Sequence, residues 1–192
     1  MNKILLHACC APCASYPINL LRDEGYEPAV YFYNPNIYPQ DEHEKRLDEL
    51  IRYAQKENFE LIYEPYTPDD FIKIAKGLEN EPEKGKRCEK CFYLRLSKTA
   101  QKAAALNIPE FTTTLTVSPH KVSYQVFCTG EICAEQYGVK FAPYDFKKKD
   151  GFKITQQIAR ENNMYKQTYC GCIYSLHSRD LRADTMSALP KI

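Results

Sequence analysis

Apolar residues follow two patterns that alternate along the chain. Short apolar runs rich in β-branched and aromatic residues predict strands at residues 3–8, 28–33, 59–63, 111–116 and 141–146. Between them, apolar residues at helical spacing predict helices at residues 16–24, 41–58, 69–78, 92–106 and 155–162, and another that opens at residues 118–119 and runs toward residue 135. This alternation favours an α/β sandwich around a parallel sheet.

Two loops of this arrangement stand out because they follow predicted strands. Residues 9–13 come after the first strand and residues 118–121 after the fourth. Ligands of parallel sheets bind at the carboxyl ends of the strands, so both loops should face one crevice. No internal repeat, low-complexity tract or linker interrupts the sequence, which predicts a single domain over residues 1–192.

Composition is that of an ordinary globular protein. The 192 residues are 44% hydrophobic and 27% charged, with a formal net charge of +1. No apolar run is long enough to cross a membrane and the apolar start of the chain is too short for a signal peptide, so we expect a cytoplasmic protein with no membrane partner. Basic clusters at residues 84–87 and 147–149 are more typical of a solvated face than of a nucleic-acid surface.

The nine cysteines are the unusual feature of the composition. A secreted disulfide scaffold is usually shorter and has an even count, so in a reducing cytosol this number points to metal binding or redox chemistry. Seven of the nine fall in three groups, a CCAPC loop, a C-x-x-C and a C-G-C: Cys9, Cys10, Cys13, Cys88, Cys91, Cys170 and Cys172. Cys128 and Cys133 lie on a predicted helix and are expected to be buried as small hydrophobic residues.

Each group is suited to hold a metal if the fold brings the three together. Thiolates spaced C-x-x-C can reach one ion, and Gly171 allows an unusual backbone angle between two cysteines. Seven thiolates exceed the four that one tetrahedral zinc needs. Four could hold a 4Fe–4S cluster, leaving about three for a second metal centre. A thioredoxin-like dithiol fits less well, because it needs no further cysteines.

Five segments that run in order over nearly the whole chain match one family. They are HACCAPC (7–13), YNPNIYPQDEHEKR (33–46), RCEKCFYLRL (87–96), TTTLTVSPHK (112–121) and YCGCIYS (169–175). In these segments the chain resembles the cobalamin-independent, QueH-type epoxyqueuosine reductases, which perform the last step of queuosine synthesis on tRNA. The resemblance implies a fold like that of adenine-nucleotide α-hydrolases, with a 4Fe–4S cluster beside a second mononuclear metal ion, iron or zinc.

The resemblance also implies roles for individual residues. The cysteines of the CC, C-x-x-C and C-G-C motifs would be ligands, and Cys13 stands where relatives can have a carboxylate. Our division of the ligands gives the cluster Cys10, Cys88, Cys91 and Cys170, and gives the second metal Cys9, Cys13 and Cys172. Residues 153–155 depart from the arginine–serine pair expected there, which weakens any substrate contact assigned to them.

The candidate catalytic and substrate-binding residues could also have purely structural roles. Cys13, His120 and Lys121 are the candidate catalytic residues, since the last two follow the fourth strand and could donate protons, although His120 could simply stand at a capped helix start. Asn34, Asn36, Arg87 and Arg95 are the candidate substrate-binding residues. The asparagines could merely shape a turn, and the arginines could neutralise thiolates, bind tRNA phosphate or lie on the surface.

The sequence thus predicts reduction of the epoxide of epoxyqueuosine at the wobble position of tRNA, with electrons from an unidentified donor and an oligomeric state left open. Uncharged side chains are poor one-electron donors, so a redox cofactor must supply the electrons. One alternative is a zinc-stabilised, non-catalytic RNA-binding module. Another is a nucleotide-dependent α-hydrolase-like enzyme, but the residues after the first strand are cysteines in place of a glycine-rich phosphate loop.

Overall fold

A computed structural model describes residues 2–187. Its centre is a five-stranded, all-parallel sheet with strand order β3-β2-β1-β4-β5. The strands are β1 (Asn2–His7), β2 (Tyr26–Phe32), β3 (Leu61–Tyr63), β4 (Glu110–Thr113) and β5 (Lys140–Phe141). The predicted α/β fold with a parallel sheet is confirmed.

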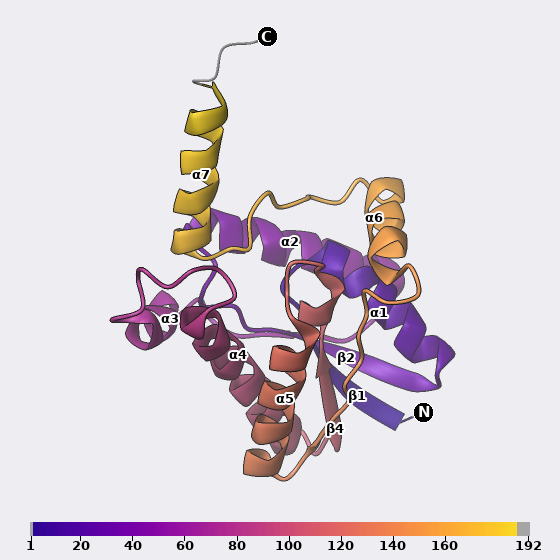
Figure 1. Ribbon diagram of the computed structural model, residues 1–192. Coiled ribbons are helices and arrows are strands. Elements are labelled where there is room, and N and C mark those ends of the chain that lie inside the picture. Colours follow the sequence, from indigo (N-terminus) through magenta and orange to yellow (C-terminus); the bar gives the residue numbers. More distant parts are fainter. Residues whose placement is uncertain (1, 188–192) are drawn as a thin grey trace.

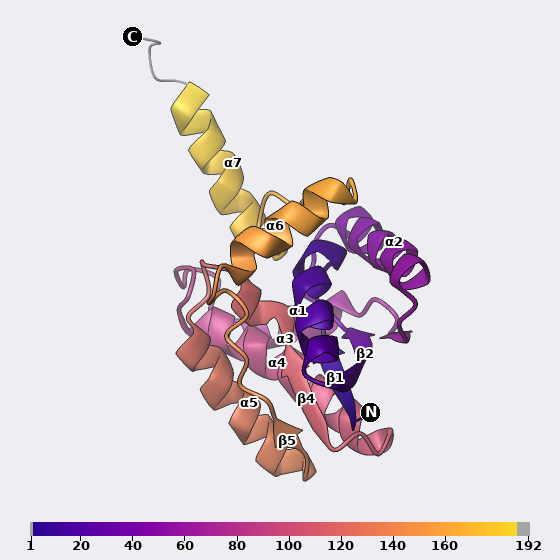
Figure 2. The same cartoon turned by 90° about the vertical axis from the view of Figure 1, so that its right-hand side faces the viewer.

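Helices cover both faces of the sheet (Figures 1 and 2). The helices are α1 (Ala11–Asp23), α2 (Gln40–Glu57), α3 (Pro68–Ala75), α4 (Lys86–Ala105), α5 (Ser123–Tyr137), α6 (Gly151–Glu161) and α7 (Ile173–Ser187), with a 3-10 turn η1 (Thr114–Val117). Ile4 and Leu6 of β1 pack in a core with α1, α2 and α6. Leu5 points the other way, into a core with α4 and α5, as the period-two alternation of a strand requires.

The helix starts that bear on the site differ from the prediction. Helix α1 begins at Ala11 rather than residue 16, with Cys10 as its N-cap, and α4 begins at Lys86 rather than residue 92. Polar or cysteine-rich first turns carry no apolar periodicity, so the pattern located only the later turns of each helix. As a result Cys13 lies in the first turn of α1 and the C-x-x-C motif lies in the first turns of α4.

The region after the fourth strand was also predicted wrongly. Strand β4 ends at Thr113, whose side-chain oxygen accepts a hydrogen bond from the backbone of Leu115 and starts η1. Ser118 closes that turn instead of opening a helix, and α5 begins only at Ser123. The last strand, β5, is limited to Lys140–Phe141.

Helix α7 had no sequence prediction and stands out from the body of the molecule (Figures 1 and 2). Its start packs against α3, where the Tyr174 ring lies 6.3 Å from that of Phe71. Leu181, further along, is 68% exposed. No helix within residues 2–187 is long and apolar enough to span a membrane.

Candidate metal centre

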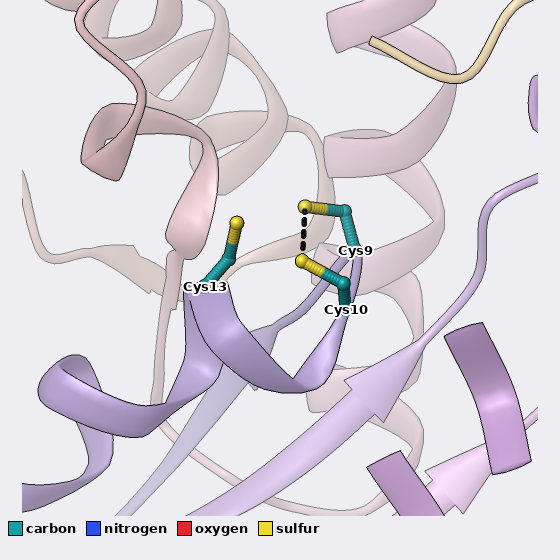
Figure 3. Close-up of side chains that lie close together, drawn as sticks. All are labelled: Cys9, Cys10 and Cys13. Atoms are coloured by element: carbon teal, nitrogen blue, oxygen red, sulfur yellow. Dashed lines mark hydrogen bonds between the residues drawn. The ribbon is translucent and has the colours of Figure 1, made fainter. Parts of the chain in front are cut away.

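The CCAPC loop brings three sulfur atoms together where β1 passes into α1. The Sγ atoms of Cys9, Cys10 and Cys13 all lie within 4.8 Å of one another, and those of Cys9 and Cys10 are 3.8 Å apart (Figure 3). We call this group the triad. Its position at the N-terminus of α1 favours negative charge, because the helix dipole and free backbone N–H groups point toward it.

Hydrogen bonds and burial shift the pKa values of the three triad cysteines in different directions. Hydrogen bonds from Cys10 and Cys13 lower the pKa of Cys9, and the charges of Lys121 and Arg46 add to this. Burial raises the pKa of Cys10 to about 12, and hydrogen bonds with Cys10 and Cys9 raise the pKa of Cys13. Three free thiols of this kind fit a divalent metal, since its charge would displace their protons.

A second group of cysteines forms where α4 begins and α7 approaches it. Burial raises the pKa of Cys88, and raises that of Cys91 to about 12, and the charges of both Cys170 and Cys172 raise them further. Cys91 and Cys172 also belong to one apolar cluster with α3. These four residues, which we call the quartet, thus converge from two segments far apart in the sequence.

Two cations connect the triad and the quartet. Burial opposes the charge of Arg95, but the thiolates of Cys91 and Cys170 outweigh burial and raise the pKa of Arg95, and Cys9 contributes as well. Burial likewise opposes the charge of Lys121, but the charges of Cys170, Cys9 and Cys13 outweigh burial and raise the pKa of Lys121. The loop after β1 and the segment after β4 therefore share one site, as predicted from the carboxyl ends of the strands.

Arg46 of α2, which the sequence analysis did not single out, fixes the C-G-C motif. Its side chain is 1% exposed, donates from Nε to Glu42 at 2.8 Å, and donates from Nη1 and Nη2 to the carbonyl oxygens of Cys170 (3.4 Å) and Tyr169 (3.3 Å). Gly171 lies against it with φ +125°, and a Cβ there would meet Arg46 Nη1 at 3.2 Å. The predicted special backbone angle at Gly171 is confirmed.

His7 is the second buried residue whose role only the structure reveals. Its Nε2 lies 3.3 Å from the carbonyl oxygen of Tyr33 and its Nδ1 lies 2.9 Å from Thr113 Oγ1. A carbonyl only accepts, so Nε2 carries the hydrogen and Nδ1 accepts from Thr113. Burial lowers the pKa of His7 to about 3, so the imidazole is neutral. Its two hydrogen bonds connect β1 to β4 and to the residue that follows β2.

The predicted substrate-binding residues are all buried. Asn34 donates from Nδ2 to the carbonyl of Ala8 at 2.9 Å, and the Oδ1 atoms of Asn34 and Asn36 have no partner within residues 2–187. Arg87 and Arg95 are 6% and 2% exposed, so the surface alternative was wrong for both. Arg87 donates to the carbonyls of residues 78 and 79, and Arg95 to that of Cys91 at 3.2 Å.

Other predicted residues are more exposed. His120 lies at the surface, where its backbone N–H donates to Ser118 Oγ at 3.3 Å, and the helix that it was expected to start does not begin there. Cys133 is buried as predicted, but Cys128 is exposed, so that prediction was wrong for Cys128. Of the three residues predicted to act in catalysis, Cys13 belongs to the triad and its charge acts on Lys121; the catalytic roles stay predictions.

Gln167, between α6 and α7, also reaches the triad and lies outside every motif recognised in the sequence. Its Nε2 lies 3.2 Å from Cys10 Sγ and 3.9 Å from Cys13 Sγ. No feature of the sequence indicated this contact, because Cys10 and Gln167 are 157 positions apart.

Comparisons with known proteins agree on one family. The family model described as epoxyqueuosine reductase QueH matches residues 4–178. The epoxyqueuosine reductase QueH of Histophilus somni is 40% identical over 176 residues, covering 91% of this chain and 72% of the relative. That of Thermotoga maritima is 35% identical over 182 residues, covering 93% of each.

Two solved structures are similar in fold. U34-tRNA thiolase NcsA from Methanococcus maripaludis, solved with its 4Fe–4S cluster, gives a TM-score of 0.56 at 11% identity over 99% of this chain and 69% of that one. A predicted subunit of tRNA methyltransferase from Methanocaldococcus jannaschii gives a TM-score of 0.59 at 11% identity over 89% and 95%. The predicted likeness to adenine-nucleotide α-hydrolase folds agrees with these neighbours.

Proposed function

The chain belongs to the QueH family of epoxyqueuosine reductases, and we propose that it reduces the epoxide of epoxyqueuosine at the wobble position of tRNA to the alkene of queuosine. The observation that supports this most strongly is the triad, whose three sulfur atoms lie within 4.8 Å of one another. The mutual charge effects among Cys88, Cys91, Cys170 and Cys172 support a second group of thiols formed by the other two motifs. The reaction consumes two electrons and two protons and releases the epoxide oxygen as water, so a redox cofactor is required.

The cysteines fit a 4Fe–4S cluster and a second metal, iron or zinc. When bound, the cluster would supply electrons singly and the second metal would act as a Lewis acid. The division made from the sequence, with Cys10 among the cluster ligands and Cys172 beside the second metal, stays a prediction. The short distances within the triad and the mutual charge effects within the quartet favour a different grouping, in which Cys10 stays with Cys9 and Cys13, and Cys172 joins the quartet.

Side chains of the chain itself would hold the substrate and move protons. We favour Lys121 over His120 as the group that donates a hydrogen bond to the epoxide oxygen, because the charges of Cys170, Cys9 and Cys13 act on Lys121, whereas His120 lies exposed at the surface. Asn34 and Asn36 stay predicted substrate-binding residues, but both side chains are buried, so contact with the substrate would require them to become accessible. The contacts of Arg87 and Arg95 with backbone carbonyls favour a role in holding the C-x-x-C segment.

The tRNA is the proposed macromolecular partner, and the reaction also requires an electron donor. Family membership and the two tRNA-related neighbours support tRNA as substrate. Binding through exposed lysines such as Lys148 should weaken steeply with salt, because each phosphate contact releases counterions. The cytoplasmic location and the single-domain organisation over residues 1–192 stay predictions.

The test begins with anaerobically prepared protein. We expect a brown protein with acid-labile sulfide, bleached by dithionite, that converts epoxyqueuosine-tRNA to queuosine-tRNA. Cys91→Ser should lose the colour and the activity, whereas Cys128→Ser, the same change at an exposed cysteine outside the site, should keep both. A colourless protein that contains only zinc after reconstitution, and leaves the epoxide intact, would instead support the zinc-stabilised RNA-binding module.

A further inference from the structure

The side-chain amide of Gln167 is the only group from the α6–α7 segment, residues 162–172, that hydrogen-bonds to the triad among the described residues. Its Nε2 lies 3.2 Å from Cys10 Sγ and 3.9 Å from Cys13 Sγ. Its Oε1 is buried and has no hydrogen-bond partner within residues 2–187. The two sulfur contacts are therefore the hydrogen bonds that orient this amide.

Contacts on both sides of Gln167 hold its segment independently of the sulfur atoms. On one side, the Tyr165 hydroxyl donates to Glu42 Oε2 at 2.6 Å. On the other, Arg46 Nη2 donates to the carbonyl of Tyr169 at 3.3 Å. Because α2 supplies both partners, the fold itself presents the amide to the triad, and the position does not depend on the weak attraction between an amide and a thiol.

We propose that Gln167 is a positioning residue that donates its N–H groups to the Cys10 and Cys13 thiolates and thereby sets how strongly they bind a metal. A hydrogen bond to a thiolate stabilises its charge and withdraws electron density from the sulfur. Groups that hydrogen-bond to metal ligands commonly change metal affinity about 10- to 100-fold and tune the electronic properties of the centre. The inference rests on the proposed function in one respect, namely that the triad ligates a metal.

Cobalt(II) is a suitable probe, since thiolate-to-cobalt charge-transfer absorption reports directly on the sulfur donors and needs no substrate. The protein is titrated anaerobically with Co²⁺ under reducing conditions. In Gln167→Leu we expect affinity at fixed pH to fall about 10- to 100-fold, because the proton competes more strongly with the metal for a sulfur that has lost its hydrogen-bond donor. We also expect the charge-transfer band to move to lower energy, because sulfur without the hydrogen bond gives up its electron more readily.

Two control variants separate this effect from looser packing. Tyr165→Phe removes the hydrogen bond to Glu42 and so loosens the same segment without touching sulfur, and Gln157→Leu makes the identical change at an exposed position of α6. Both should leave the band in place. An unmoved band in Gln167→Leu, or an equal shift in Tyr165→Phe, overturns the inference while the metal centre stands. A wild-type protein with no thiolate-to-cobalt band overturns the inference and the proposed metal centre together.

Discussion

Arg46→Met tests whether the buried ion pair on α2 holds the site together. Arg46 and Glu42 have side chains 1% and 8% exposed and are 2.8 Å apart. Removing one member of such a pair leaves the other charge buried without its partner, which typically costs about 3–5 kcal/mol. The contacts from Arg46 to the carbonyls of Tyr169 (3.3 Å) and Cys170 (3.4 Å) orient the C-G-C segment, but they are long, so their loss adds little to the free energy of unfolding. We therefore expect the free energy of unfolding to fall by about 4 kcal/mol.

Thermal unfolding of the reduced, metal-free protein measures this loss. In a domain of this size about 1 kcal/mol shifts the midpoint by roughly 2–4 °C, so Arg46→Met should lower it by roughly 8–16 °C. Arg52→Met is the matched control, because Arg52 lies on the same helix and pairs with Glu49, but its side chain is 49% exposed. An exposed pair contributes at most about 1 kcal/mol.

The double variant Arg46→Met/Glu42→Met gives an internal check. Replacing both members of a buried pair by apolar side chains is often close to neutral, so much of the lost stability should return. If Arg46→Met and Arg52→Met shift the midpoint equally, or if the double variant is simply the sum of two losses, the ion pair does not have the role argued here.

Two further predictions concern the backbone and a buried histidine. Gly171→Ala should lower the free energy of unfolding by about 1–3 kcal/mol in urea denaturation, because φ +125° is strained for alanine and Arg46 crowds the added Cβ. Gly25→Ala, at φ +88° with no atom within 4 Å, should cost less. Equal losses in the two variants would contradict the crowding by Arg46. Burial also lowers the pKa of His43 below 6.5, so the native state stays neutral while the unfolded chain takes up a proton, and stability is lost as the pH falls below that value. His43→Phe should reduce the loss measured between about pH 7 and about pH 5, and an unchanged pH dependence would assign the loss to other groups.

Much of the fold follows from the pattern of apolar residues, and the failures occur where that pattern stops. The sheet was predictable because its neighbouring strands β1 and β2 contain buried apolar runs and the other strands are short β-prone segments between helical stretches. The starts of α1 and α4 were not, since the cysteines there serve the site rather than the core. Helix α7 was missed because none of its described side chains, at residues 173–181, is buried, so this part of the helix has no buried apolar stripe to detect.

Some residues of the site could be recognised from their residue type alone, whereas others could be recognised only from their contacts in the folded protein. The cysteines were predictable because clustered thiols are rare and chemically specific. Arg46 and Gln167 were not, because an arginine or a glutamine in a polar segment looks like a surface residue until a partner far along the chain is known. Gln167 meets Cys10 across 157 positions, and Arg46 meets Cys170 across 124.

The charges around the cysteines explain why these partners are cations and amide donors. The seven thiols lie in a partly buried region where four cations, Arg46, Arg87, Arg95 and Lys121, interact with their charge. Four positive charges cannot balance seven thiolates, so most of the thiols keep their protons, as the raised pKa values of Cys10, Cys13, Cys88 and Cys91 indicate. Full deprotonation would require additional positive charge at the sulfurs, which metal ions provide. The cations and hydrogen-bond donors around the cysteines thus compensate only part of the charge of the thiolates, and a bound metal would supply the rest.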